Sequence, residues 1–348
     1  MRLLRVIMLL PFSMIYGSLM AVRNVLYDLG ILKSHRPQIP TVIVGNLSVG
    51  GTGKSPHVEH LIRELRSHYK LGIISRGYGR KTKGFIEVQR NSLSSEVGDE
   101  PLQIKQNFPE IPFAVCESRN KGIEGLFRSY PDLELILLDD AMQHRSVKGS
   151  FVIMLSLFNA PFFRDWVLPS GNLREFAFLG KQRGDACIYT KCPENLSVAL
   201  KTKYANEFSK DKPSYFSTFE YDSWRLMSQK PSIELLEHVI LVTGIAYPQP
   251  LIDHLEKSYS VEIMNFRDHH DFNAGDVAAI HRKFTNFEAR KSAIVCTEKD
   301  AVKLELFKDV SENKEIPWYC IPIRVQVDKN EQLINQIQQY VKSYSRGR

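Results

Sequence analysis

Hydrophobic and polar residues alternate along most of the chain in the pattern of an α/β protein. Residues 39–45 form a short apolar run, rich in β-branched side chains and bounded by proline and glycine, which predicts a buried strand. In residues 56–69 the apolar side chains recur every three or four positions, which predicts a helix. Further apolar runs predict strands at residues 71–75, 111–116, 133–139, 151–155 and 186–189. This order predicts a mostly parallel sheet flanked by helices on both faces.

A second set of elements follows the polar residues 209–231, where two prolines indicate a hinge. The pattern there predicts strands at 238–243, 261–266, 293–296 and 318–323, and helices from 248, at 274–285 and at 332–344. We therefore expect an N-terminal helical segment at residues 1–36, a larger domain at 37–230 and a smaller α/β domain at 231–348.

The N-terminal segment begins with 17 uncharged residues, from Val6 to Val22. A helix of that length spans about 25 Å, which is short for a bilayer core of about 30 Å, and Pro11 and Gly17 interrupt it. A cleaved signal peptide, a spanning helix and a helix lying in the membrane interface all fit this composition. The basic residues at both ends favour the interfacial helix.

Charge narrows the set of partners. The chain has 348 residues, 46 basic and 39 acidic, and a net charge of +7. Residues 1–40 carry +4 of that charge, so we expect a basic N-terminus that faces an anionic surface and no nucleic-acid partner. The five cysteines are scattered without a C-x-x-C pair, which indicates a reduced chain without a cysteine metal site.

The strongest motif is the sequence GNLSVGGTGKS at residues 45–55, between the first predicted strand and helix. Glycines there allow backbone N–H groups to approach phosphate oxygens, and the helix N-terminus adds its dipole. Lys54 is expected to reach the β- and γ-phosphates and Ser55 to hold Mg²⁺. The strict pattern would have glycine in place of Ser48. The predicted nucleotide-binding residues are Gly50, Gly51, Thr52, Gly53, Lys54 and Ser55.

Acidic residues end the strand at 133–139. Asp139 and Asp140 stand beside the predicted phosphate loop, where carboxylates hold Mg²⁺, although a helix cap is the simpler role for such acids. Other candidates are acids and bases in turns: Asp99 before a predicted helix, and His269 beside an aspartate, as a base with its orienting group. Side chains expected to contact substrate or phosphate are Arg76, Gln143, His144, Arg145, Arg174 and Glu175.

Taken in order, these motifs resemble the tetraacyldisaccharide 4′-kinase family of lipid A biosynthesis. The matching pieces are residues 23–28, 45–55, 75–80, 98–101, 138–145, 168–175, 268–270 and 297–303. The resemblance implies a two-domain P-loop kinase that uses ATP and Mg²⁺. Its acceptor would be the 4′-hydroxyl of a tetraacylated glucosamine disaccharide 1-phosphate, at the cytoplasmic face of the inner membrane.

The resemblance also implies roles. Asp99 would be the catalytic base and His269 its support, Asp139 and Asp140 would bind the metal, and Arg174 and Glu175 would line the site. The chain departs from the family at Ala141 and Met142, where the family has glycine and phenylalanine.

Two other functions fit the phosphate loop. One is a membrane-recruited P-loop ATPase switch, which the absence of a signature lysine at Val49 disfavours. The other is a soluble kinase whose N-terminal helix is part of its core.

Overall fold

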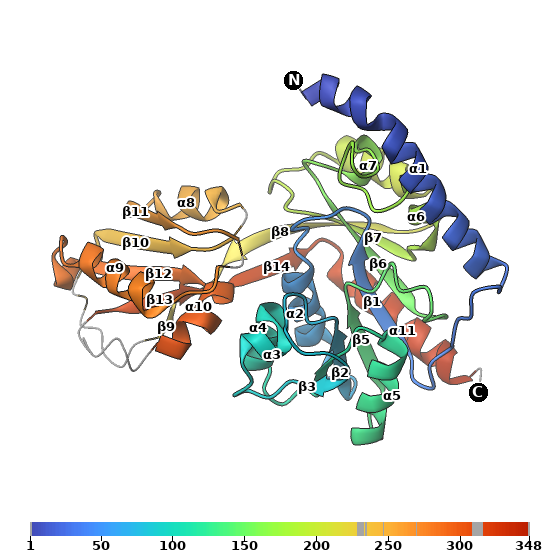
Figure 1. Ribbon diagram of the computed structural model, residues 1–348, viewed down its shortest axis with the longest axis horizontal. Coiled ribbons are helices and arrows are strands. Elements are labelled where there is room, and N and C mark those ends of the chain that lie inside the picture. Colours follow the sequence, from blue (N-terminus) through green and yellow to red (C-terminus); the bar gives the residue numbers. More distant parts are fainter. Residues whose placement is uncertain are drawn as a thin grey trace.

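Two sheets, joined by a two-stranded ribbon, organise the protein (Figure 1). The computed structural model describes residues 2–227, 233, 235–245, 247–268, 270–307 and 316–346. Within those residues the larger sheet has nine strands in the order β14-β8-β7-β6-β1-β5-β2-β4-β3. The seven strands from β8 to β4 pair in parallel, while β14 and β3 run antiparallel at the two edges. The predicted mostly parallel sheet is confirmed.

The strands of the larger sheet are buried over most of their length. Their bounds are β1 Thr41–Asn46, β2 Leu71–Ser75, β3 Ile86–Glu87, β4 Phe113–Val115, β5 Leu135–Asp139, β6 Phe151–Leu157, β7 Ala186–Thr190, β8 Ser214–Tyr221 and β14 Ile323–Val327. Because β1, β5 and β2 are adjacent and parallel, the loops at their carboxyl ends meet at one edge of the sheet.

Helices cover both faces of this sheet, and a separate apolar core lies on each face. One core contains residues of α2 (Lys54–Leu65), α4 (Asp99–Asn107) and α11 (Asn330–Arg346). The other contains residues of α5 (Arg119–Ser129) and α7 (Val198–Phe208). The shorter helices are α3 Ser94–Val97 and α6 Ala177–Gly180.

The smaller sheet has the strand order β11-β10-β12-β13-β9, with only β9 antiparallel. Its strands are β9 Arg225–Leu226, β10 His238–Thr243, β11 Ser260–Asn265, β12 Ser292–Thr297 and β13 Trp318–Ile321. The helices that accompany it are α8 Gln249–Leu255, α9 Ala274–Phe284 and α10 Glu298–Leu304.

The end of the chain does not belong to the smaller sheet. Strand β14 pairs with β8 at the edge of the larger sheet, and Leu333, Ile337 and Val341 of α11 are buried in its core. The expected second domain at 231–348 is therefore too long, because residues 323–346 return to the first. The expected hinge at 209–231 likewise contains β8, a strand of the larger sheet. The hydrophobic pattern predicted the helix at 332–344, but it predicted neither β8, whose polar residues indicated a hinge, nor a separate strand at β14.

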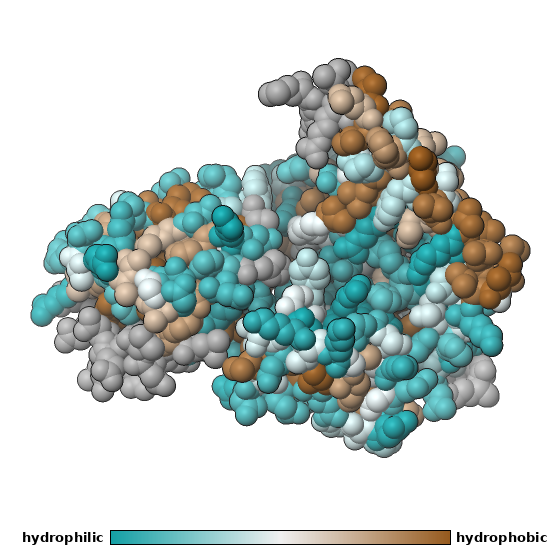
Figure 2. Space-filling model, in the orientation of Figure 1, coloured by the Kyte–Doolittle hydropathy of each residue, from teal (hydrophilic) through white to brown (hydrophobic). Residues whose placement is uncertain are grey.

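Helix α1 (Arg2–Asp28) is continuous through Pro11 and lies along one side of the larger unit (Figure 1). By length and composition it is the one helix of the described residues that qualifies as a membrane span. Its exposed side is apolar, and Figure 2 shows hydrophobic residues along it. The residues of this stripe are Met8, Phe12, Ile15, Leu19 and Val22, each 57–67% exposed.

In its described part, the buried residues of α1 are Ser13, Gly17 and Asn24, which are small or polar, and beside them Tyr16 packs against the apolar core. Ser13 is buried and its hydroxyl donates to that of Ser170, 2.7 Å away. Gly17 lies so close to Phe176 that a Cβ atom there would be 2.5 Å from the ring. A soluble amphipathic helix has the opposite arrangement, so α1 presents its apolar stripe to something other than water.

Helices α4 and α10 bring the two units into contact. The Asn107 side-chain amide donates to Glu59 (3.2 Å) and to Glu298 (3.1 Å), and so joins α2, α4 and α10. Burial, with the carboxylate of Glu298 nearby, raises the pKa of Glu59. Next to this contact, Lys303 Nζ lies 2.7 Å from the Asp99 carboxylate and 2.8 Å from the His270 carbonyl oxygen.

Replacing Lys303 with alanine should destabilise the protein. The Lys303 side chain is 5% exposed, so its loss leaves a buried carboxylate without this partner, at an expected cost of about 3–5 kcal/mol. Urea unfolding at pH 7.5 measures the effect. Lys299→Ala is the matched control from the same helix, because Lys299 pairs with Asp268, whose side chain is 43% exposed, and should change stability by less than about 1 kcal/mol. Equal effects of the two substitutions would contradict this assignment.

Candidate active site

The phosphate loop lies between β1 and α2, in the predicted strand–loop–helix context. Gly53 is the N-cap of α2 and has a left-handed backbone (φ 84°). A Cβ atom at that position would lie 2.6 Å from the Phe219 ring, so both backbone and space require glycine. Thr52 is buried, and its hydroxyl accepts a hydrogen bond from Asn46. The helix N-terminus and Lys54 supply positive charge next to this loop.

Two cations flank Asp140 at the end of β5. Asp140 Oδ1 lies 3.8 Å from Lys54 Nζ and accepts a hydrogen bond of 3.2 Å from Arg174. Burial by itself would raise the pKa of Asp140, but Lys54 and Arg174 outweigh it and hold the pKa below its usual range. Asp140 also has a left-handed backbone (φ 46°), which is uncommon for a residue with a side chain. The sequence predicted the gathering of Lys54, Asp140 and Arg174.

Asp139 is buried beside Asp140. Burial, together with the carboxylates of Glu100 and Asp140, raises its pKa to about 7. Its Oδ2 accepts a hydrogen bond from Ser75, while its buried Oδ1 has no hydrogen-bond partner within the described residues. A buried carboxylate oxygen without a donor suits a hard cation, so the donor set fits Mg²⁺.

Ser55 completes this donor set. Its hydroxyl donates to Glu100 Oε2 at 2.6 Å, so the start of α4 lies against the start of α2. No group of three or more histidines, cysteines, aspartates or glutamates forms a metal-binding cluster among the described residues. A cation here would therefore depend on the Ser55 hydroxyl together with Asp139 and Asp140. Glu100 was not among the predicted site residues, although it adjoins Asp99 in the motif at 98–101.

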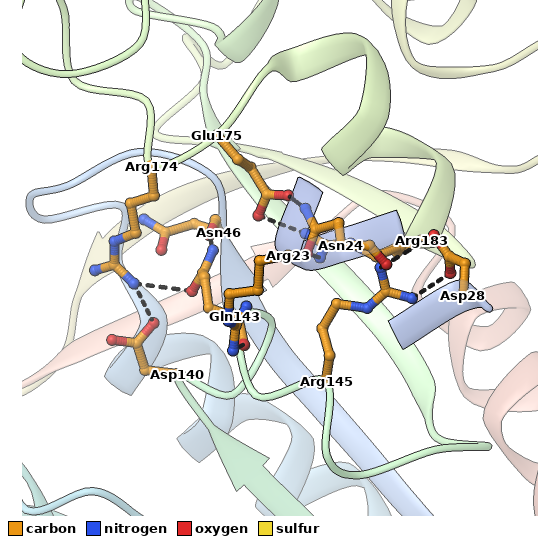
Figure 3. A network of polar contacts seen from close by, with 10 residues as sticks. All are labelled: Arg23, Asn24, Asp28, Asn46, Asp140, Gln143, Arg145, Arg174, Glu175 and Arg183. Atoms are coloured by element: carbon orange, nitrogen blue, oxygen red, sulfur yellow. Dashed lines mark hydrogen bonds and ion pairs between the residues drawn. The ribbon is translucent and has the colours of Figure 1, made fainter. Parts of the chain in front are cut away.

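A continuous polar network leads from Asp140 to helix α1 (Figure 3). Arg174 donates to both Asp140 and Gln143, and the Gln143 amide donates to the Asn46 carbonyl oxygen at 2.8 Å. The Gln143 carbonyl oxygen in turn accepts a hydrogen bond from Arg23 of α1. Asp140 is therefore connected to helix α1 through Arg174, Gln143 and Arg23.

Two predicted substrate contacts lie on the α1 side of this network. Arg145 forms an ion pair with Asp28 and donates to the Asn24 carbonyl oxygen at 3.0 Å. Glu175 is buried, accepts a hydrogen bond of 2.8 Å from Asn24 and pairs with Arg183. Their contacts in the structure anchor α1, and no direct contact of either with the phosphate loop is present among the described residues.

Arg76 and His144 lie near each other, at the carboxyl ends of β2 and β5. Arg76 is exposed, whereas His144 is partly buried. Burial, with the cations Arg119 and Arg76, lowers the pKa of His144 to about 4, so its imidazole is neutral at pH 7. Arg119 is a site residue that sequence reasoning missed: it is fully buried and donates to the carbonyl oxygens of Asp139 and Asp140.

The remaining predicted residues lie where the two units meet. Asp99 is the first residue of α4, next to Glu100, and pairs with Lys303 of the smaller unit. His269 lies outside the described residues. Met142, where the resembling family has phenylalanine, is buried against the start of the phosphate loop, since a Cβ atom on Gly45 would lie 2.7 Å from its Cβ.

Comparison with known proteins agrees with this geometry. The family model for tetraacyldisaccharide-1-P 4′-kinase matches residues 5–342. The tetraacyldisaccharide 4′-kinase of Cytophaga hutchinsonii is 38% identical over 339 residues, which cover 95% of each chain. That of Flavobacterium psychrophilum is 40% identical over 344 residues, 96% of each chain.

A solved structure has the same architecture. The crystal structure of LpxK from Aquifex aeolicus, in complex with ATP, is 28% identical and covers 97% of this chain and 99% of its own, with a TM-score of 0.76. The order of the motifs, the fold and the near-complete match in length all agree, and the chain belongs to the tetraacyldisaccharide-1-P 4′-kinase family.

Proposed function

We propose that this chain transfers the γ-phosphate of ATP to the 4′-hydroxyl of a tetraacylated glucosamine disaccharide 1-phosphate, which gives lipid IVA in lipid A biosynthesis. The network of Figure 3 carries the proposal together with the family membership, because it connects a phosphate-binding site to a helix with an exposed apolar stripe. A kinase for a water-soluble sugar has no use for such a helix.

The phosphate side of the reaction needs positive charge and alignment. Lys54, Arg174 and the backbone N–H groups of residues 50–55 face the phosphates of ATP in this proposal. Mg²⁺, held by Ser55, Asp139 and Asp140, supplies charge neutralisation of the phosphate oxygens when it is bound. Arg76 lies at the same edge of the sheet and binds a phosphate group of one of the substrates.

The acceptor hydroxyl needs a base, and we assign this role to Asp99. It follows Gly98 at the first position of α4, and the next residue, Glu100, accepts a hydrogen bond from Ser55, so Asp99 stands one residue from a contact with the start of α2. Its ion pair with Lys303 connects it to the smaller unit. The site is then complete only when both units are together, which protects ATP from hydrolysis. His269, from the same unit as Lys303, supports Asp99.

Helix α1 places the enzyme at its substrate. Four acyl chains keep the acceptor in the membrane, and the stripe from Met8 to Val22 offers apolar side chains to that membrane. Leu29 and Ile31, which follow the helix, are also exposed and extend the apolar surface (Figure 2). The enzyme then lies at the inner membrane with its site on the cytoplasmic face, where ATP is available.

Asp99→Asn should lower kcat for lipid phosphorylation by about 10²–10⁴-fold, because the hydroxyl proton loses its acceptor. ATP affinity should change little. Transfer of labelled γ-phosphate from ATP to the disaccharide 1-phosphate in mixed micelles measures the rate. Asp271→Asn, which removes a more distant carboxylate 3.9 Å from the same Lys303, is the matched control and should stay near wild type. Labelled phosphate released without labelled lipid, from the wild type, would instead favour the ATPase switch.

Replacing Phe12, Ile15 and Leu19 together with serine should reduce membrane binding. The three side chains are 61–64% exposed, so they contribute little to the folded core but much to the apolar stripe. Sedimentation with vesicles of anionic and zwitterionic phospholipid should show at least a tenfold loss of bound protein, with ATP affinity unchanged. Ile263→Ser, an exposed apolar position in β11, is the control. Equal sedimentation of the triple variant and wild type would contradict the role of α1.

Mg²⁺ affinity should rise with pH through about 7. The carboxyl of Asp139 has a pKa near 7, and the proton must leave before a cation can bind, so protons compete with Mg²⁺ below that pH. The Mg²⁺ concentration for half-maximal phosphorylation should fall by about fivefold between pH 6 and pH 7, as the deprotonated fraction of Asp139 rises. Asp139→Asn should weaken Mg²⁺ binding and remove this pH dependence. Asp140→Asn should weaken Mg²⁺ binding and move the dependence to lower pH, because the Asp140 carboxylate contributes to the raised pKa of Asp139. Any pH dependence that persists in Asp139→Asn belongs to the titration of ATP itself.

A further inference from the structure

The end of β7 and the residue after it contact the phosphate loop. Thr190, the last residue of β7, is fully buried, and its hydroxyl donates to the Thr52 carbonyl oxygen at 2.9 Å. The next residue, Lys191, donates from Nζ to the Gly51 carbonyl oxygen at 3.1 Å. Two successive carbonyl groups of the phosphate loop are thus bound by two successive side chains from another strand.

These contacts set the direction of the N–H groups. In a planar trans peptide the N–H points away from the C=O. Because the carbonyls of Gly51 and Thr52 turn toward β7, the N–H groups of the same two peptides turn away from it. The Thr52 N–H already donates to the Gly50 carbonyl oxygen at 3.0 Å, so the group that these contacts turn toward a phosphate is the Gly53 N–H at the start of α2. Phosphate oxygens bind backbone N–H groups of this kind in glycine-rich loops.

Lys191 is held in an unusual conformation to make its contact. It is one of three non-glycine residues with positive φ (56°) among the described residues, and another is Asp140 of the site. Its ammonium group also lies 5.9 Å from the centre of the Phe219 ring, which packs against Gly53. Backbone strain of this kind persists where surrounding contacts enforce it and is concentrated at functional sites.

A glycine-rich loop gains most from such support. Gly50, Gly51 and Gly53 give the loop backbone the freedom that close approach to phosphate requires, but a mobile loop must be ordered when the nucleotide binds. Contacts that order the loop beforehand therefore increase affinity without touching the nucleotide.

We infer that Thr190 and Lys191 are positioning residues for the nucleotide: they fix the carbonyl side of the phosphate loop so that the Gly53 N–H faces the phosphates of ATP. The inference rests on the proposed use of ATP and adds two residues that act through the loop. Neither belongs to the motifs by which the sequence resembles its family.

Equilibrium binding of ATP to the full-length protein tests the inference, by isothermal titration calorimetry in detergent. Thr190→Val, which keeps the shape but removes the hydroxyl, and Lys191→Met, which removes the ammonium group, should each weaken ATP binding by about tenfold. Thr190→Ser should bind like the wild type because it keeps the hydroxyl. In the kinase assay the KM for ATP should rise in the two weakened variants, while the KM for the lipid stays constant.

Matched controls separate this role from general destabilisation. Thr243 is a buried threonine at the end of β10 whose hydroxyl has no hydrogen-bond partner in the described part of the chain. Lys201 lies over the Phe216 ring as Lys191 lies over Phe219. Thr243→Val and Lys201→Met should leave ATP affinity unchanged. If Thr190→Val does not fold, ATP binding by Lys191→Met tests the inference alone. This variant is expected to fold because the Lys191 side chain is partly exposed.

Folded Thr190→Val and Lys191→Met proteins that bind ATP as tightly as the wild type would overturn the inference, whatever their melting temperatures. A wild type that phosphorylates the lipid alongside such variants would leave the proposed function intact. Conversely, a wild type that binds ATP but labels no lipid, with weakened binding in the two variants, would support the inference and overturn the proposed function. A wild type that does not bind ATP would overturn both.

Discussion

Gln143 connects three parts of the molecule that lie far apart in the sequence. Its side-chain amide donates to Asn46 at the end of β1 and accepts from Arg174, and its backbone carbonyl accepts from Arg23 of α1. An amide side chain both donates and accepts, which a carboxylate or an ammonium cannot do. The loop after β5 is thereby fixed relative to the phosphate loop and to α1 together. The phosphate loop, the loop after β5 and the apolar helix are thus joined through the same residue.

Helix α1 is held against the protein mainly by hydrogen bonds, and its apolar stripe stays exposed. Its buried face is made of residues that can form specific contacts, such as Ser13 with Ser170 and Asn24 with Glu175, and its apolar residues remain outside. If α1 packed against the protein through its apolar stripe, these side chains would be buried and could not contact a lipid surface. Hydrogen bonds and close approach at Gly17 hold the helix instead. The helix is therefore fixed in orientation while its apolar side stays available.

The sequence was sufficient for most local elements of the larger sheet and for the strand–loop–helix context of the phosphate loop, but it indicated a hinge at β8 because the residues there are largely polar. The strand, loop and helix around Lys54, and the acids at the end of β5, depend on short-range patterns. The return of β14 and α11 to the larger sheet was not predictable, because pairing between Ile323 and Tyr221 is set by contacts a hundred residues apart. The placement of Arg145 and Glu175 against α1 was missed for the same reason. Charge and position in a motif do not tell which of two neighbouring surfaces a side chain meets.

The ribbon between the two units also contacts the phosphate loop. Strands β8 and β14 run antiparallel from the larger sheet toward the smaller unit (Figure 1). Phe219 of β8 lies against Gly53 at the start of α2 and tilts against the His57 ring. Because Gly53 has no side chain, the ring reaches the loop backbone, and bending of this strand would change the space beside the phosphates. The smaller unit therefore meets the site twice: through Lys303 on Asp99 and through the strand that carries it.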